Sequence, residues 1–448
     1  MQSIQAVARY FPEKCGGIQV HLNELLPELK RHSIDSKIAA SQDQSEPETY
    51  EYNGIEVFRY PVFPTPKAEP NHGQFPHGGF KDFANWLKTQ KADIYHQHQW
   101  TPKCGLPHLR LAKELGMATV VTIHLPQPIC QRQTLMLQGQ TACDGKINIV
   151  RCSRCCDSIS RSAPDNFLKL ASYTPTSVLS RVPLPASCYL PTQVHGAMGS
   201  FVRPFTTPAY VSARLRSLRD MSKFADKIIA VCSWLYDSLL SNELPEEKLA
   251  LCRYGIISLD SKTPPVSEKK VERSLKIGFI GRWNRAKGIH ILVEAIKALP
   301  ENVDIQLFIH AIANDALYEQ EVRQRIGDDQ RIHVGRQLGR EELSSALTAY
   351  DALAVPSQWL ETGPLVVLEA YSLGLPVLGS NLGGIAELVK HGVDGLLVPP
   401  DNVRAWSEAM LRLATEPNVL NQLQQGIKPV RTVGMEVADL VALYQSLR

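Results

Sequence analysis

Residues 275–299 read LKIGFIGRWNRAKGIHILVEAIKAL, and this stretch contains the pattern that decides the fold. The run from Leu275 to Ile280 is mainly apolar and short, as in a buried strand, and Gly281-Arg282 ends it. Apolar side chains then recur at spacings of three and four, which places them on one face of a helix: Ile289, Leu292, Val293 and Ile296. A strand, a loop and a helix in this order form the repeating unit of a parallel α/β sheet.

The same alternation continues on both sides of this stretch. In the second half it predicts five further strands, at Asp304–Ile309, Ile332–Val334, Ala352–Val355, Pro376–Leu378 and Gly395–Val398. In the first half it predicts strands at Ile4–Tyr10, Asp93–His96, Ala118–Ile123 and Asp226–Val231. A glycine turn at Gly16-Gly17 and an amphipathic helix follow the first of these strands. We therefore predict the α/β class, with two Rossmann-like domains built from parallel sheets and flanking helices.

Chain length and composition predict the domain plan. The 448 residues exceed one ordinary core and favour two domains of about 200 residues each. Residues 258–273 contain Pro264-Pro265 and several charges, and they are predicted to link an N-terminal domain, 1–257, to a C-terminal domain, 274–425. A stretch at about 130–217, rich in Cys, Pro, Ser and Thr, is predicted to be an insertion in the first domain.

Composition and charge limit the class of protein. A hydrophobic fraction of 44% and a charged fraction of 21% are typical of a globular protein. A net charge of +3 is too small to indicate nucleic-acid binding. The sequence lacks a secretory signal at its start and an apolar run of about 20 residues, so we expect a cytoplasmic protein. A pI near 8.2 is compatible with peripheral contact at the inner face of the membrane.

The loop after the 275–280 strand is basic. Arg282 offers a planar fork of donors and Lys287 a point charge, and together they could neutralise a diphosphate. Loops at the carboxyl ends of parallel strands are where such sheets bind ligands. A solvated surface loop is the alternative.

A second loop, Pro356 to Pro364, leads into a predicted helix. Thr362 is predicted to cap this helix and Pro364 to lie in its first turn. The backbone N–H groups of Leu365 and Val366 could then meet a phosphate.

Two acids lie on this loop and helix. Glu369 could accept two hydrogen bonds from ribose hydroxyls, and Glu361 could reach hydroxyls of a donor sugar. For Glu369 the alternative is an acid that the helix dipole favours near the first turn.

Glu361 and Glu369, with seven residues between them, and the Gly-Arg…Lys-Gly loop at 281–288 resemble the retaining glycosyltransferases of family four. Those proteins have the GT-B fold, in which two Rossmann-like domains face each other across a cleft. The resemblance covers nearly the whole chain and includes Gly16-Gly17, His124, Arg253-Tyr254-Gly255 and residues 380–387, SNLGGIAE. The sequence departs from the family at Thr362-Gly363-Pro364, where relatives often have Gly-Phe-Gly, and at residues 310–313, HAIA.

The resemblance implies a function and a set of site residues. It implies transfer of a hexose-type sugar from a nucleotide-diphosphate sugar to a glycan, polysaccharide or lipid-linked acceptor, with retention and without a catalytic metal. The implied catalytic residues are Arg282 and Lys287 at the diphosphate, Glu361 at the transferred sugar, and His124 across the cleft. The implied donor-binding residues are Gly16, Gly17, Gly281, Gly363, Leu365, Val366 and Glu369. Residues 426–448 would form a C-terminal helix that crosses back to the N-terminal domain.

Two alternatives stay open for the function. One is a catalytically silent protein of the same fold that binds a sugar or a partner, although the intact acids and cations count against it. The other is a different nucleotide-sugar enzyme, such as an epimerase.

Five cysteines of the insertion fall within 27 positions of one another. Four of them are predicted to form a structural zinc site, with Cys156 as a further candidate ligand: Cys130, Cys143, Cys152 and Cys155. Free or redox-active thiols, a disulfide and an iron–sulfur cluster remain alternatives.

The end of the insertion is basic, through Arg203, Arg214, Arg216, Arg219 and Lys223. This basic segment is either a surface for anionic lipid or a lipid-linked diphosphate, or a solvated helix face.

Overall fold

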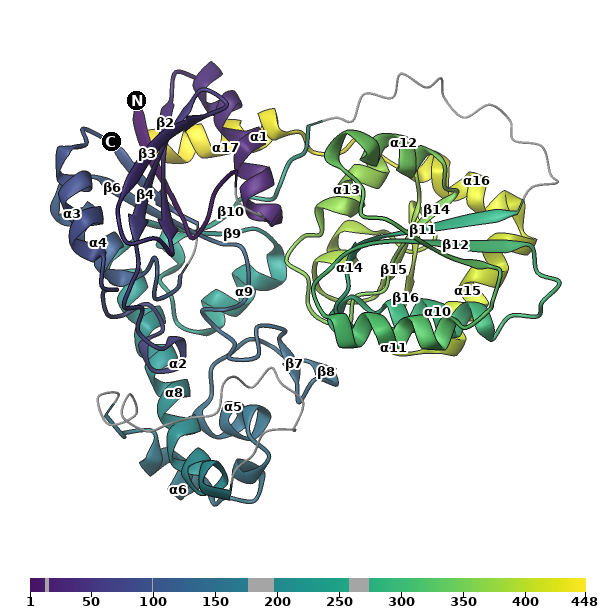
Figure 1. The fold of residues 1–448 in the computed structure, drawn as a ribbon, viewed down its shortest axis with the longest axis horizontal. Coiled ribbons are helices and arrows are strands. Elements are labelled where there is room, and N and C mark those ends of the chain that lie inside the picture. The colour runs from purple at the N-terminus through teal and green to yellow at the C-terminus, as the bar shows by residue number, and fades with distance from the viewer. Residues whose placement is uncertain (13–15, 99, 176–196, 258–273) are drawn as a thin grey trace. The chain divides into compact units, whose positions relative to one another are not determined.

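The computed structural model describes residues 1–12, 16–98, 100–175, 197–257 and 274–448, which form two compact units (Figure 1). Unit 1 contains Met1–Arg253 together with Val433–Arg448, and unit 2 contains Tyr254–Thr432. Each unit has one large, mainly parallel sheet with helices packed on it. The predicted α/β class with two parallel-sheet domains is therefore confirmed. The predicted linker, 258–273, lies outside the described residues.

The unit boundaries differ from the predicted ones for a reason that the backbone shows. Ile256 pairs with Thr432 in a parallel bridge, and the N–H of Ile256 donates to the carbonyl of Arg431 at 3.1 Å. Because of this bridge, residues 254–257 and the segment that ends at Thr432 both belong to unit 2. The predicted boundary at residue 257 is therefore wrong by a few residues, and the predicted segment 426–448 is divided between the two units.

The sheet of unit 1 has eight strands in the order β10-β9-β6-β5-β1-β2-β4-β3. Its neighbouring strands are parallel except β3 and β4, which the Asn53-Gly54 turn joins as a hairpin with positive φ at both residues. The strands are β1 (Gln2–Val7), β2 (Asp35–Gln42), β3 (Glu48–Tyr52), β4 (Ile55–Pro61), β5 (Ile94–Gln97), β6 (Ala118–Ile123), β9 (Lys227–Ala230) and β10 (Leu249–Leu251).

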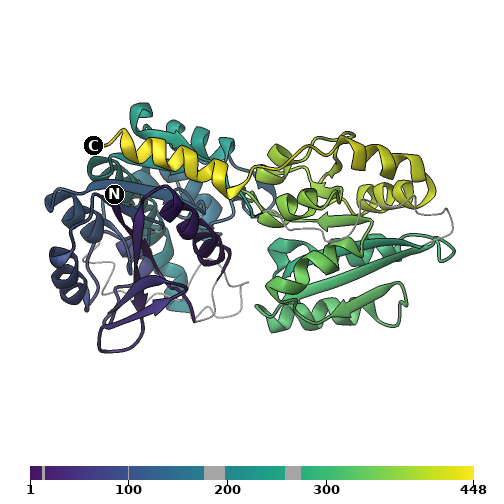
Figure 2. The ribbon, with the colours of Figure 1, turned by 90° about the horizontal axis from the view of Figure 1, so that it is seen from above.

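Helices cover this sheet, and the last helix of the chain is one of them. They are α1 (Gly17–Arg31), α2 (Ala68–Asn71), α3 (Phe80–Thr89), α4 (Leu106–Glu114), α9 (Ser233–Ser241), the short η2 (Glu246–Lys248) and α17 (Val433–Gln445). Helix α17 lies beside α1 in unit 1 (Figure 2), and its Val437, Leu440 and Tyr444 are buried in the same core as Leu22 and Leu25 of α1. Burial of such side chains contributes about 1.5–3 kcal/mol each, which attaches the end of the chain to unit 1.

The insertion of unit 1 is a small helical subdomain. Its elements are β7 (Met136–Leu137), β8 (Thr141–Ala142), α5 (Ile149–Cys156), η1 (Ile159–Arg161), α6 (Asp165–Ala171) and α8 (Ala197–Phe224). Helix α8 packs against α4, α5 and α6, so it joins the insertion to the sheet's own helices. Helix α8 continues to Phe224, beyond the predicted end of the insertion at about residue 217.

The sheet of unit 2 has six parallel strands in the order β13-β12-β11-β14-β15-β16. The strands are β11 (Leu275–Arg282), β12 (Ile305–Ile312), β13 (Ile332–Gly335), β14 (Ala352–Val355), β15 (Val377–Ser380) and β16 (Gly395–Val398). The helices are η3 (Arg285–Lys287), α10 (Ile289–Lys297), α11 (Ala316–Ile326), η4 (Arg340–Glu342), α12 (Leu343–Thr348), α13 (Leu365–Ser372), α14 (Gly383–Leu388), α15 (Val403–Thr415) and α16 (Pro417–Gly426).

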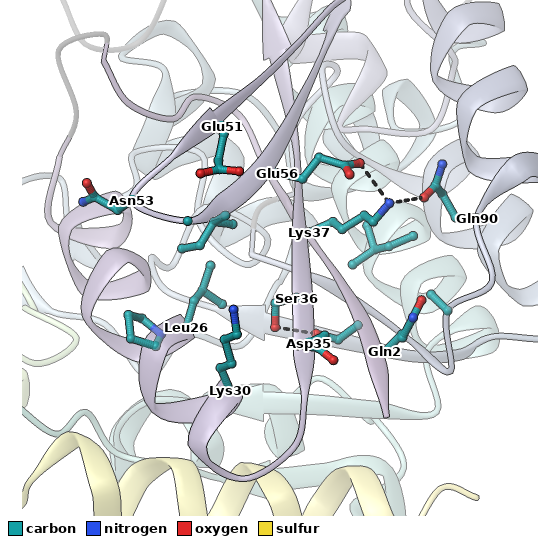
Figure 3. A pocket seen from close by; sticks show the side chains of 16 residues that line it. Gln2, Leu26, Lys30, Asp35, Ser36, Lys37, Glu51, Asn53, Glu56 and Gln90 are labelled. Carbon is teal, nitrogen blue, oxygen red and sulfur yellow. Dashed lines mark hydrogen bonds and ion pairs between the residues drawn. The ribbon is translucent and has the colours of Figure 1, made fainter.

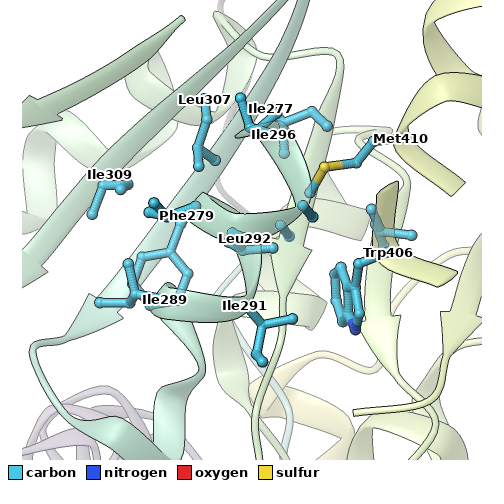
Figure 4. Packing of buried hydrophobic residues seen from close by; sticks show 14 of the residues in the cluster. Ile277, Phe279, Ile289, Ile291, Leu292, Ile296, Leu307, Ile309, Trp406 and Met410 are labelled. Atoms are coloured by element: carbon cyan, nitrogen blue, oxygen red, sulfur yellow. The ribbon is translucent and has the colours of Figure 1, made fainter. Parts of the chain in front are cut away.

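The core of unit 2 explains why the 275–299 stretch decides the fold. Side chains of β11 and β12 meet the apolar face of α10, and Trp406 and Met410 of α15 pack beside them (Figure 4). Ile277, Leu292 and Trp406 are fully buried. The apolar spacing in the sequence therefore corresponds to one continuous layer between sheet and helices.

Candidate functional site

Strand order identifies the edge of each sheet where a ligand is expected. In unit 2 the chain winds outward in one direction from β11 and in the other from β14, so their carboxyl ends form a topological switch point. In unit 1 the equivalent point lies between β1 and β5. Ligands of open parallel sheets bind at such points. The loops that sequence analysis selected, 281–288 and 356–364, follow β11 and β14.

The two loops of unit 2 are locked together by close backbone contacts. The N–H of Gln358 donates to the carbonyl of Ala286 at 2.7 Å. Gly288 has a φ of 73°, and a Cβ there would lie 1.9 Å from the carbonyl oxygen of Pro356. A side chain at this position is therefore excluded by both conformation and space. The contact fixes Lys287 relative to the second loop.

Lys287 and Glu361 form an ion pair at this edge. Lys287 Nζ lies 2.5 Å from Glu361 Oε1, and the same oxygen accepts hydrogen bonds from Ser357 Oγ at 2.7 Å and Trp359 Nε1 at 2.8 Å. The side chains are 20% and 9% exposed. Burial acts to raise the pKa of Glu361, but the charge and hydrogen bond of Lys287, with those of Ser357 and Trp359, lower it overall. Glu361 is therefore held as a carboxylate.

A third loop supports Glu361 from behind. The N–H of Gly384 donates to the carbonyl of Glu361 at 2.6 Å. A Cβ on Gly383, which has a φ of 51°, would lie 2.8 Å from Leu360 Cα. The two glycines in SNLGGIAE are thus explained by the close approach of the β15–α14 loop to the acid's backbone.

Glu369 is buried on α13 and pairs with Arg340 of η4. The sequence analysis did not include Arg340, because 28 residues separate it from the acid. Its position between the predicted strands 332–334 and 352–355 gave no signal that it would reach Glu369. The pair supplies a fixed carboxylate one turn inside the helix.

The start of α13 differs from the prediction. Pro364 is the N-cap and Leu365 the first helical residue, so the prediction that Thr362 caps the helix is wrong. The N–H groups of Leu365 and Val366 occupy the first two helical positions, where helix geometry provides no intrahelical acceptor. Gly363 precedes them with a φ of 144°, which favours glycine.

The remaining predicted residues of unit 2 lie at the end of β11. Arg282 is exposed and, among the described residues, forms no ion pair. A Cβ on Gly281 would lie 2.8 Å from the Phe279 ring, so this glycine has a packing role.

The predicted residues of unit 1 lie at its own switch point. Gly16 is the N-cap of α1, and its N–H donates to Gln19 Oε1 at 3.0 Å. Gly17 begins the helix, and no described atom lies within 4 Å of the position a Cβ would take. His124 follows β6, and His98 follows β5.

His124 is buried against a second histidine that sequence analysis did not include. Its Nε2 lies 3.0 Å from His98 Nδ1, and His98 Nε2 lies 2.8 Å from Gln5 Oε1. Burial, and to a smaller extent the neighbouring histidines including His21, hold the pKa of His98 and His124 well below the usual value. Both rings are therefore neutral at physiological pH. The signal that could have indicated His98 is the His96-x-His98 alternation at the end of a strand.

A pocket of about 330 Å³ lies elsewhere on unit 1 (Figure 3). Gln2, Asp35 and Ile55 line it, and these residues lie at the amino ends of β1, β2 and β4. Lys37 also lines the pocket, and its Nζ lies 2.9 Å from Glu56 Oε1 and 3.1 Å from Gln90 Oε1. The pocket is thus at the opposite edge of the sheet from His98 and His124, and it is not part of the candidate site.

The five cysteines lie in the insertion with different environments. Burial raises the pKa of Cys152 to about 11, whereas a hydrogen bond with Cys156 lowers the pKa of Cys155 to about 6. The N–H of Gln138 also donates to Cys155 Sγ at 3.1 Å. Across the residues with described positions, no three His, Cys, Asp or Glu side chains are grouped so that they could hold a metal. The zinc site stays a prediction.

The basic residues of α8 are mostly engaged within unit 1. Arg214 is buried and donates to the Gln127 carbonyl and to Gln131. Arg219 pairs with Glu243 at 3.5 Å and Lys223 with Asp220 at 2.9 Å. Arg219 and Lys223 are exposed and ion-paired, as the solvated-face interpretation expects, whereas Arg214 is buried and belongs to neither predicted surface. The lipid surface stays a prediction. In the described part of the chain, no helix is both long and apolar enough to cross a bilayer.

Comparisons with known proteins agree with the division of the chain into two units. The model of Glycosyl transferases group 1 matches residues 260–428, and that of a Glycosyl transferase 4-like domain matches residues 16–153. The D-inositol 3-phosphate glycosyltransferase of Corynebacterium urealyticum is 32% identical over 148 residues, which cover 31% of this chain and 35% of that protein. The UDP-Gal:alpha-D-GlcNAc-diphosphoundecaprenol alpha-1,3-galactosyltransferase of Escherichia coli is 30% identical over 165 residues, 36% of this chain and 42% of that protein. The first matches span about a third to a half of the curated relatives' length.

Solved structures share the fold over the whole chain. Anabaena HepE in complex with UDP and glucose has a TM-score of 0.62 at 15% identity and full coverage of both chains. Sucrose-phosphate synthase from Thermosynechococcus elongatus has a TM-score of 0.64 at 17% identity, covering 100% of this chain and 98% of the other.

Proposed function

Because the chain belongs to the glycosyl transferases of group 1, we propose that it transfers a hexose from a nucleotide-diphosphate sugar to an acceptor hydroxyl. The acceptor is a glycan, a polysaccharide or a lipid-linked sugar, and the anomeric configuration is retained. The observation that carries the proposal is the Lys287–Glu361 ion pair at the switch point of unit 2, beside the first turn of α13. HepE, of the same fold, binds UDP and UDP-glucose.

The chemistry of glycosyl transfer fits the charges at this edge. When the bond from the sugar to the diphosphate breaks, negative charge develops on the leaving oxygen and positive charge on the sugar ring. Arg282 and Lys287 supply positive charge for the diphosphate. Lys287 has three N–H donors, so it can keep its bond to Glu361 while it binds a phosphate oxygen. The N–H groups of Leu365 and Val366 add donors for the same group.

The acids hold the two sugars in this proposal. Glu369, oriented by Arg340, accepts hydrogen bonds from the ribose. Glu361, kept ionised by Lys287, accepts from hydroxyls of the transferred hexose. The leaving diphosphate takes the proton of the acceptor hydroxyl as the new glycosidic bond forms on the same face of the sugar. This route uses no catalytic metal.

The test starts with a panel of UDP-, GDP-, ADP- and dTDP-sugars, measured by release of the nucleoside diphosphate with and without glycan acceptors. With the active donor, Lys287→Met and Arg282→Gln should lower kcat by about 10²–10³-fold, as removal of a donor to a developing anion does. Arg285→Gln is the matched control, because Arg285 lies in the same loop but pairs with Glu321. NMR of the product gives its anomeric configuration.

Equal losses in Arg285→Gln and Lys287→Met would contradict the assignment of the site. Binding of a nucleotide sugar without any transfer would instead favour the catalytically silent alternative.

A further inference from the structure

Lys287 is flanked by two contacts with the loop that follows β14. On one side, the carbonyl of Ala286 accepts a hydrogen bond from the N–H of Gln358 at 2.7 Å. On the other side, the carbonyl oxygen of Pro356 lies so close to Gly288 that a Cβ there would be 1.9 Å from it. Lys287 therefore cannot shift relative to this loop unless one of the two contacts is lost.

Glu361 is held by the two residues next to Gln358 in the sequence. Ser357 Oγ and Trp359 Nε1 donate to Glu361 Oε1 at 2.7 and 2.8 Å. The Nζ of Lys287 also lies 5.7 Å from the centroid of the Trp359 ring, within the range of a cation–π contact. A change in the backbone of this segment would thus displace partners of both charged groups.

The side chain of Gln358 fixes the backbone of this segment. Its Nε2 donates to the carbonyl of Pro356 at 2.7 Å and to the carbonyl of Pro400 at 2.5 Å. Pro400 follows β16, and the carbonyl of its neighbour Pro399 accepts from Nε1 of the fully buried Trp406 at 3.0 Å. Gln358 therefore ties the loop after β14 to a second loop, which the core of unit 2 holds in place.

The two bonds of Gln358 require an amide. A carboxamide nitrogen carries two N–H groups, so it can donate to two carbonyl oxygens at once. A carboxyl group of the same shape offers one O–H when protonated and no donor when ionised, and a thioether offers none. Substitutions of nearly equal size can therefore remove the donors without emptying the space.

We propose that Gln358 is a positioning residue, whose amide joins the loops after β14 and β16 and thereby holds Lys287 and Glu361 at the separation that transfer needs. Gln358 acts through these two side chains and needs no contact with a substrate. Its effect on transfer rests on the proposed function, whereas its hold on the ion pair does not.

The bonds of the amide can be measured in the native full chain by ¹H–¹⁵N NMR. The side-chain N–H groups of Gln358 should exchange with D₂O more slowly than those of Gln330, by roughly tenfold or more. Gln330 is the reference because it also lies in unit 2 and its Nε2 donates to a backbone carbonyl, that of Asp328 at 3.0 Å, at an exposed site. Exchange at Gln358 as fast as at Gln330 would overturn the proposal.

A variant without donors tests the hold on the ion pair. In Gln358→Met the indole N–H signal of Trp359 should shift, because its bond to Glu361 is displaced. The kcat should fall about 10–100-fold, since a displacement of about 1 Å in an active site has an effect of this order. Gln330→Met is the matched control and should change neither quantity.

The outcomes separate this proposal from the proposed function. An unchanged Trp359 signal in Gln358→Met would refute the hold on the ion pair. A shifted signal with an unchanged kcat would leave that hold standing and count against the role of the pair in transfer.

Gln358→Glu adds a readout that a loss of stability alone would not give. A protonated carboxyl can donate to one of the two carbonyls, whereas a carboxylate would face both without a proton to donate. Because the carbonyls favour the protonated form, the kcat of Gln358→Glu relative to the native kcat should rise as the pH falls from about 8 to about 6. The same ratio for Gln358→Met should change less over this range.

Equal pH slopes in the two variants would refute the role of the amide donors. If Gln358→Met does not fold, the exchange rates of the native protein and the pH slope of Gln358→Glu still decide.

Discussion

Replacement of Lys287 by methionine should destabilise the protein as well as slow transfer. Methionine keeps most of the apolar stem of lysine and removes its charge. Glu361 would then remain buried, with Ser357 and Trp359 still donating to Oε1. Removing one partner of a buried ion pair costs about 3–5 kcal/mol. Because two neutral donors remain, we expect the lower end, about 3 kcal/mol.

The loss should depend on pH in a defined direction. In the native protein the pKa of Glu361 is lowered, so the pair stabilises the fold above the ordinary glutamate pKa and is lost as the pH falls through the lowered value. In Lys287→Met burial is no longer offset by the cation, so the pKa of Glu361 should rise. The variant should therefore lose stability as the pH rises above about 4.3. The difference between the two proteins should be largest near pH 7.5 and smaller near pH 4.5.

The assay is unfolding by urea and by heat at both pH values. About 3 kcal/mol corresponds to a fall in Tm of roughly 6–12 °C for a domain of the size of unit 2. The double variant Lys287→Met/Glu361→Gln should recover about 1–2 kcal/mol, since a neutral amide no longer carries a buried charge. Arg404→Met serves as the control, because Arg404 and Glu408 form an exposed pair on α15 and its loss should cost under about 0.5 kcal/mol.

An equal stability of Lys287→Met and the native protein at pH 7.5 would refute the reasoning. So would a deficit that is the same at both pH values, because the loss would then not come from the charge of Glu361.

Three further outcomes are expected. Gly17→Ala should leave the free energy of unfolding unchanged or raise it by up to about 1 kcal/mol, since no described atom occupies the Cβ position. Transfer should fall, because in the proposed function a ligand approaches the backbone there. Equal transfer rates in the variant and the native protein would contradict this. After chelator treatment, iodoacetamide at pH 7 should modify Cys155 several-fold faster than Cys152, because their pKa values are about 6 and about 11. Peptide mass spectrometry measures the two rates, and the reverse order would contradict these pKa values. Transfer should continue in EDTA, while metal analysis of the untreated protein should find about one zinc per chain if the cysteine site forms; loss of transfer in EDTA that Mg²⁺ restores would contradict a reaction without a catalytic metal.

The sequence by itself determined the class of fold and the location of most strands. Apolar runs and three-to-four spacings report local burial, so β6, β14 and β16 have the predicted bounds and β11 differs only by including Gly281 and Arg282. The Asn53-Gly54 pair was a sufficient hairpin signal for β3 and β4, but those strands were not predicted. Glycines and charges at strand ends also indicated the two loops of unit 2, since loops after parallel strands carry function in this class.

Only the tertiary structure decided which of these groups meet. Lys287 and Glu361 are 74 residues apart and meet because β11 and β14 are neighbours in the sheet although not in sequence. Arg340 of η4 reaches Glu369 of α13 across 29 residues. Hydrogen bonds join Gln5, His98 and His124 within unit 1, and Gln5 Nε2 also donates to Tyr444 OH at 3.5 Å near the end of the chain, since α17 packs on unit 1. Sequence patterns carry the period of each element but not the order of the strands or the face on which a distant helix packs. The strand order and the packing of a distant helix depend on the apolar surface buried over the whole unit, and a short stretch of sequence does not contain that information.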